Sequence, residues 1–179
     1  MTVAETLRPG DAGRWTGTLT TRSGLTFDVR PARREDEAAL ADCFAHVAPD
    51  DMRFRFLTAC KDVGHDRLVA MTDIDHDHVE NFLAVLPDGT VIASALISVD
   101  DGGERAEVAV AIRADYRARG VGWTLLDHVA HYVEARGVKV LESYESAENH
   151  AAITLEREMG FVTERVAGDP TVVRVSRRF

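Results

Sequence analysis

The sequence predicts an α/β (α+β) fold in which helices flank a central mixed, mostly antiparallel sheet of six to seven strands. Three observations support this class. Short apolar, β-rich runs are mixed with amphipathic stretches along the chain. Turn sequences with Asp and Gly join three of these runs directly, which predicts antiparallel neighbours. One run leads through a glycine-bearing loop and an amphipathic helix into another run, an order typical of a parallel crossover.

The N-terminal half predicts a tail, a β-hairpin and three helices. Residues 1–14 are polar and contain Gly and Pro, so we expect a flexible tail before a single domain over residues 15–179. Two β-rich runs, Thr16–Thr21 and Leu25–Arg30, flank Ser23-Gly24 and predict the hairpin. The spacing of apolar residues predicts helices over Arg34–His46, Asp50–Leu57 and His65–Met71, and Asp50 is a candidate cap.

The C-terminal half predicts a meander, a crossover and a closing α-β-β unit. The meander strands are expected at Asn81–Val85, Val91–Val99 and Arg105–Ile112. A helix over residues 121–135 buries a row of apolar side chains and stops at Gly137, a natural C-cap. The remaining elements are a strand at Val138–Ser143, a helix at Asn149–Met159, and strands at Phe161–Val166 and Thr171–Arg177.

Composition excludes several classes of protein. The formal net charge of −9 argues against a nucleic-acid partner, which would require a basic surface. No apolar stretch reaches membrane-spanning length, and residues 1–11 lack a signal-peptide pattern. Cys43 and Cys60 lie in apolar, helix-like contexts and are expected to be free buried thiols. We therefore expect a cytoplasmic protein with no membrane or nucleic-acid partner and no metal.

The most informative segment is Arg117-Ala118-Arg119-Gly120-Val121-Gly122, between an apolar strand and an amphipathic helix. Backbone amides and the helix dipole make such a turn an anion site, and Arg113 lies close by in the sequence. Trp123 and Thr124 stand where a P-loop needs Lys and Ser or Thr, and the third glycine of a dinucleotide fingerprint is also missing. The pattern Arg-x-x-Gly-x-Gly instead resembles the acyl-CoA pyrophosphate loop of the GNAT N-acyltransferase superfamily.

A second motif agrees with this resemblance. Residues 149–161, from Asn149 to Gly160-Phe161, are similar to the superfamily's Asn-x-x-Ala segment that ends in Gly-Phe. Further segments look like the acetyltransferase domain of bacterial protein lysine acetyltransferases, the kind that act on acyl-CoA synthetases. These segments are Thr26–Pro31 leading into Arg34–Asp36, Met52–Phe56, Asp73–Asp75 and Glu104–Val110.

The resemblance implies acetyl-CoA as co-substrate and transfer of its acetyl group to a primary amine. The expected acceptor is a protein lysine, for example in an acyl-CoA synthetase. Two alternatives stay open: acetylation of a small amine such as a polyamine or an amino sugar, and a catalytically idle module that senses acyl-CoA. A homodimer also stays open.

Deprotonation of the amine requires a base, because a lysine amine has a pKa of about 10.4 in solution. Glu107 is our candidate, since strand alternation places its side chain on one face with the small Ala109 and Ala111. The resemblance implies the same assignment. Glu104, in the preceding loop, is the second candidate, and a purely structural ion pair is the alternative role of Glu107.

The resemblance also implies the cofactor contacts. The backbone at Val110, Ala111 and Ile112 would contact pantetheine, and an amide near Val110, at a bulge that parts this strand from the next, would bind the oxyanion. Asn149 would contact the pantetheine arm, cap its helix, or do both. The pyrophosphate would lie on the loop residues Arg117, Ala118, Arg119, Gly120, Val121, Gly122 and Trp123.

Two further observations concern the chemistry. Many superfamily members carry a Tyr seven residues after this Asn as general acid, and here the position is Glu156. Either the thiolate leaves unaided or another group donates, with Tyr116, Tyr144 and His150 as weak candidates. The cluster Asp73, Asp75, His76, Asp77 and His78 has metal-ligand residue types, but no distant cluster completes a coordination set, so we expect a solvated turn.

Overall fold

The strands form one mixed sheet in the order β1-β2-β3-β4-β5-β6-β8-β7. All neighbours are antiparallel except β5 and β6, which are parallel, as the crossover predicted. The computed structural model describes residues 14–57 and 62–179, so the predicted tail and Cys60 lie outside the described residues. The strands are β1 Gly17–Thr20, β2 Thr26–Pro31, β3 Val79–Val85, β4 Val91–Val99, β5 Arg105–Ile112, β6 Val140–Ser146, β7 Val162–Val166 and β8 Asp169–Arg178.

The predicted mixed, mostly antiparallel sheet is confirmed, but it has eight strands in the described part of the chain instead of six or seven. The hairpin strand β1 extends one edge, and both closing strands join the other. The strand after the crossover also differs from its prediction, since β6 begins at Val140 and continues to Ser146. Its polar second half pairs with β8 across the whole length, and this pairing carries no hydrophobic signal in the sequence.

Seven helical segments connect the strands in the described residues. They are the 3₁₀ turns η2 Arg34–Asp36 and η3 Ala114–Tyr116, and the helices α1 Glu37–Ala45, α2 Pro49–Phe56, α3 His65–Thr72, α4 Val121–Ala135 and α5 His150–Glu158. Asp50 does not cap α2, because Ala48 is the N-cap and Pro49 takes the first helical position, which its fixed φ suits. Gly137 follows α4 at φ 86°, as the predicted C-cap requires.

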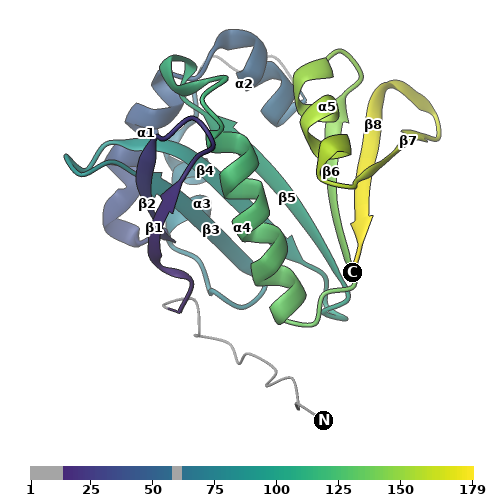
Figure 1. Ribbon diagram of the computed structural model, residues 1–179, viewed down its shortest axis with the longest axis horizontal. Coiled ribbons are helices and arrows are strands. Elements are labelled where there is room, and N and C mark those ends of the chain that lie inside the picture. Colours follow the sequence, from purple (N-terminus) through teal and green to yellow (C-terminus); the bar gives the residue numbers. More distant parts are fainter. Residues whose placement is uncertain (1–13, 58–61) are drawn as a thin grey trace.

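Two hydrophobic clusters cover the two faces of the sheet. On one face, α4 packs Leu125 and Val129 against Phe82, Ile97 and other apolar side chains of the strands. On the other face, α1, α2 and α3 pack against β3 and the end of β5. Figure 1 shows α4 crossing in front of the sheet, with α1 and α3 behind it. Cys43 is buried in the second cluster as a free thiol, and burial raises its pKa to about 12.

The parallel pair, β5 and β6, is also the point where the sheet opens. β5 and β6 are in register at Arg105–Val140, Ala106–Leu141 and Glu107–Glu142, and no ladder pair follows these three. Both strands continue for several residues, so they diverge beyond Glu107 and Glu142, as Figure 1 shows. Within residues 14–57 and 62–179, every helix is too short or too polar to cross a bilayer.

Candidate active site

A cavity of about 620 Å³ lies where β5 and β6 diverge. Its walls are the second half of β5, the middle of β6, α2, α5 and the loop that leads into α4. All the predicted cofactor contacts except Arg119 line this cavity. They are Val110, Ala111, Ile112, Arg117, Ala118, Gly120, Val121, Gly122, Trp123 and Asn149.

The loop before α4 has the backbone geometry of an anion site. Ala118 and Gly120 adopt positive φ angles of 55° and 83°, and Gly120 is the N-cap residue of α4. The first amides of the helix have no partner within it and are available to a ligand. A Cβ atom on Gly120 would lie 3.1 Å from Cβ of Thr21, and one on Gly122 would lie 2.9 Å from Cδ1 of Ile112. The loop therefore packs tightly against both the hairpin and the end of β5.

The three arginines near this loop have different environments. Arg117 lines the cavity, and its Nε lies 3.3 Å from a carboxylate oxygen of Asp51 in α2. The guanidinium of Arg119 lies 5.0 Å from the ring centre of Tyr116 and does not line the cavity. Arg113 is 9% exposed and donates to Asp42 at 2.7 Å. Of these three arginines, Arg117 is the one that lines the cavity.

The expected bulge near Val110 is absent. The β4–β5 register runs unbroken from Ala106 to Ile112, so that prediction was wrong. The strands part because β6 turns away after Glu142. Every second amide of β5 points away from β4. Beyond Glu107 these amides have no β6 ladder partner, so they face the cavity as potential oxyanion donors.

Glu107 lies at the edge of this opening. It is the last β5 residue paired with β6, it is exposed, and it stands just outside the cavity lining. Partial burial of its carboxyl raises the pKa of Glu107, the neighbouring Glu142 raises it further, and Arg55 of α2 lowers it. Arg105 is not its partner, because that guanidinium donates to Glu142 at 2.6 Å. Glu107 therefore forms no salt bridge with any of the described residues. Its raised pKa is suited to a general base.

Glu104 is remote from this arrangement. It precedes β5, pairs with Lys139 in an exposed salt bridge, and does not line the cavity.

Two glutamates to which the sequence analysis gave no catalytic role also line the cavity. Glu145 comes from β6 and accepts a hydrogen bond at 2.9 Å from the side-chain amide of Asn149. Glu156 comes from α5 and accepts a hydrogen bond at 2.5 Å from the hydroxyl of Ser143. Burial is the main cause that raises the pKa of Glu145 to about 7 and that of Glu156 to about 8.

Asn149 caps its helix, which is one of the two roles predicted for it, and it is placed in the cavity wall. It is the N-cap of α5, where its side-chain oxygen accepts from the Ala152 amide at 3.4 Å, and it lines the cavity. Of the weak candidates for the acid, Tyr116 and Tyr144 line the cavity, whereas His150 lies in an adjoining hollow.

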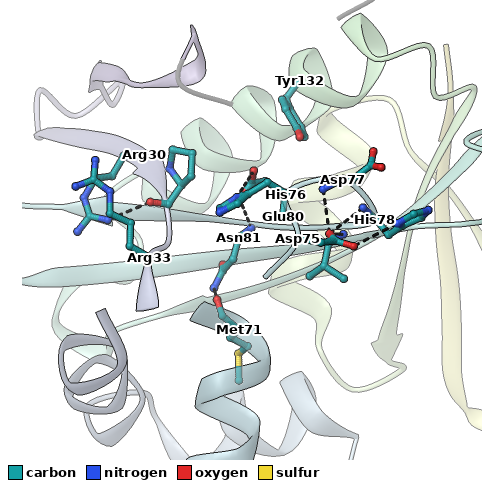
Figure 2. A network of polar contacts seen from close by, with 12 residues as sticks. Arg30, Arg33, Met71, Asp75, His76, Asp77, His78, Glu80, Asn81 and Tyr132 are labelled. Carbon is teal, nitrogen blue, oxygen red and sulfur yellow. Dashed lines mark hydrogen bonds and ion pairs between the residues drawn. The ribbon is translucent and has the colours of Figure 1, made fainter. Parts of the chain in front are cut away.

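The acidic and histidine-rich segment at 73–78 is an irregular, bent loop between α3 and β3. No group of three or more metal-ligand side chains occurs in the part of the chain that the structure describes. Asp75 accepts hydrogen bonds at 3.0 Å from the amides of Asp77, His78 and Val79, and His76 lies 3.1 Å from the buried Glu80. Figure 2 shows these contacts and the neighbouring bond from Asn81 to the carbonyl of Met71.

Comparison with known proteins identifies the family. A profile of the Acetyltransferase (GNAT) family matches residues 38–161, more than half of the chain. The chain therefore belongs to the GNAT family and is an acetyltransferase, which confirms the resemblance seen in the motifs. It is 29% identical over 150 residues to the acetyltransferase PA5475 of Pseudomonas aeruginosa, covering 81% of this chain and 80% of that protein.

Solved structures share the fold. The GNAT domain of S. lividans PAT has a TM-score of 0.86 and 23% identity, with 97% of this chain and 100% of that one covered. Spermidine N-acetyltransferase from Vibrio cholerae, solved in complex with CoA and spermine, has a TM-score of 0.69 and 18% identity, with 85% and 95% covered.

Proposed function

We propose that the protein transfers the acetyl group of acetyl-CoA to a lysine side chain of another protein, by direct attack in a ternary complex. The observation that carries this proposal is one cavity that is lined both by a helix N-terminus and by carboxyls. The helix end and Arg117 suit the diphosphate of coenzyme A. Glu107 and Ile112 are five residue steps apart on β5, about 17 Å of strand along which the pantetheine arm can lie.

Each residue then has a chemical role. Glu107 accepts the proton of the attacking amine, directly or through water, and its raised pKa brings it toward the working range. Free amides of β5 stabilise the oxyanion that forms when nitrogen adds to the carbonyl carbon. The C–S bond breaks as the C–N bond is completed, so no covalent enzyme intermediate is required.

The positive charge of Arg55, which lines the cavity, favours a protein lysine over a polyamine as acceptor. Arg55 of α2 lies near both Glu107 and Glu145, so a polycation approaching either carboxyl meets this positive charge. A single lysine on a protein surface presents one charge, which is lost before attack. The motifs shared with bacterial protein lysine acetyltransferases also support a protein acceptor, and a lysine of an acyl-CoA synthetase is the first to test.

Replacing Glu107 by Gln tests the base. Acetyl-CoA binding is expected to survive, while turnover falls at least about tenfold. Glu104→Gln is the matched comparison, because that carboxylate is three residues away and points to Lys139. Loss of turnover in Glu104→Gln with normal turnover in Glu107→Gln would move the base to the second candidate.

A thiol-release assay across proteins, polyamines and amino sugars, with mass spectrometry of the products, identifies the acceptor class. Acetylation of small amines alone would support the first alternative. Tight acetyl-CoA binding with no turnover on any amine would instead support the sensor.

A further inference from the structure

Glu156 is a buried carboxyl, and only one of its two oxygens has a hydrogen-bond partner in the described residues. It is 4% exposed, its Oε1 accepts from Ser143, and its Oε2 is buried without a hydrogen-bond partner in the described residues. The residue lines the cavity from α5. A buried carboxylate with an unpaired oxygen is costly, whereas a protonated carboxyl turns that oxygen into a donor for a ligand.

A second carboxyl, that of Glu145, lies close to Glu156. Glu145 lies two residues after Ser143 on β6, so both side chains are on one face of the strand. The Ser143 hydroxyl interacts with both carboxyls and has one proton to donate. Because the hydroxyl donates to Oε1 of Glu156, the unpartnered Oε2 is the oxygen that carries the proton when Glu156 is neutral. Glu145 accepts a hydrogen bond from the side-chain amide of Asn149 instead.

We propose that Glu156 is the catalytic acid that protonates the sulfur of coenzyme A as it leaves. The inference rests on the proposed function, because it assigns the leaving-group half of the same reaction. The C–S electron pair goes to sulfur as the C–S bond breaks, and the Glu156 carboxyl proton forms the new S–H bond. The amine's proton goes to Glu107, and exchange with solvent returns both carboxyls to their starting states, so one proton is taken up and one is released.

The two carboxyls are on the correct sides for this division of roles. Glu107 shares its face of β5 with Ala111, which packs in the cluster under α1, α2 and α3. Glu156 is on α5, whose Leu155 packs with the cluster under α4. Glu107, the base, therefore lies on the face of the sheet that α2 covers, from which an acceptor would approach. Glu156, the acid, lies on the opposite face. Glu156 lines the cavity, and Glu107 directly precedes the lining residue Val108 on β5.

The surroundings of Glu156 supply few other charges. Across the cavity, the lining residues of β5 from Val108 to Ile112 are all apolar, and α4 contributes Leu126. α2 contributes Arg55, which acts on Glu145, and α5 contributes Asn149, which binds Glu145. Arg117 and Asp51 pair at the loop end. Burial, then the charge of Glu145, raises the pKa of Glu156 to about 8, so it is mostly protonated at neutral pH.

The test is the pH profile of kcat for the wild-type protein and for Glu156→Gln. The wild-type kcat should fall as pH rises past about 8, because Glu156 then loses the proton it must donate. Glu156→Gln should bind acetyl-CoA within about twofold of wild type, turn over at least about tenfold more slowly, and lack the high-pH decline. Glu158→Gln, an exposed glutamate two residues along the same helix, should match the wild type in every respect.

Several outcomes would overturn the assignment. Turnover of Glu156→Gln within threefold of wild type, or a persisting high-pH decline, would remove Glu156 from the mechanism. Infrared spectroscopy gives a readout independent of any acceptor and of the variant's activity. The wild-type spectrum near pH 7 should contain a protonated carboxyl band that is lost at high pH, and its absence would also refute the proposal. Failure to acetylate any amine refutes the proposed function itself, and the two failures are therefore distinguishable.

Discussion

The two ends of α4 allow a backbone penalty and a packing contact to be measured separately. Gly120 precedes the helix at φ 83° and Gly137 follows it at φ 86°. Alanine at either position accepts a left-handed conformation that costs about 1–2 kcal/mol. A Cβ atom at Gly137 meets nothing within 4 Å, whereas one at Gly120 lies 3.1 Å from Cβ of Thr21. Forced overpacking of this kind typically adds about 1–3 kcal/mol.

We therefore expect Gly120→Ala to destabilise the protein by about 2–4 kcal/mol and Gly137→Ala by about 1–2 kcal/mol. For a protein of this length, each 1 kcal/mol lowers Tm by about 2–4 °C. Urea unfolding gives the free energies, and calorimetry with acetyl-CoA gives the affinities. Gly120→Ala should also weaken acetyl-CoA binding, whereas Gly137→Ala should leave it unchanged. Equal destabilisation by the two variants would refute the reasoning, because it would mean that Thr21 moves away from the new methyl group at no cost in free energy.

Two further predictions concern ion pairs. Burial raises the pKa of Asp36, but hydrogen bonds from the Arg30 guanidinium and the Arg33 amide outweigh it and hold that pKa below 3.8. This stabilisation is complete at pH values above the pKa of Asp36 in the unfolded chain, and it is lost as pH falls through the pKa of Asp36 in the folded protein. Asp36→Asn should therefore lower the free energy of unfolding by about 1–3 kcal/mol at pH 7. The difference in stability between the two proteins should begin to narrow below pH ~4 and close below the pKa of Asp36 in the folded protein, and a constant difference would contradict the pairing. Asp51→Asn should free Arg117 and tighten acetyl-CoA binding roughly threefold at low salt, by calorimetry, and weaker binding would show that Asp51 positions the arginine instead.

Local patterns in the sequence sufficed for the elements with strong hydrophobic periodicity. The bounds of α4, β4 and β5 match their predictions residue for residue, because their apolar spacing ends at glycine or at Asp-Gly turns. The three-stranded meander and the parallel crossover followed from the same signals. The start of β6 was misplaced by two residues, because Val138 still belongs to the turn that closes α4 and bonds to Val133.

The contents of the site depended on contacts that spacing does not encode. Arg113 is close in sequence to the loop but bonds to Asp42, 71 residues earlier, and so does not reach the cavity. Glu156 was visible from the sequence only as a departure from an expected tyrosine. Its position beside Ser143 results from the packing of α5 on β6, which no local pattern predicts. A buried glutamate on an amphipathic helix, with a serine and a second glutamate on the preceding strand, is the signal to look for in related chains.

The N-terminal hairpin has a practical consequence for anyone trimming this protein. The family match starts at residue 38, after β1 and β2 have ended, and every residue of the cavity wall lies beyond that point. Yet the Ser23 hydroxyl donates to the carbonyl of Arg119 at 2.7 Å, and the Arg22 guanidinium lies 4.1 Å from the ring centre of Trp123. A fragment that begins at residue 38 would retain every residue of the cavity wall, but it would lose the hairpin contacts that hold the loop before α4 in its conformation.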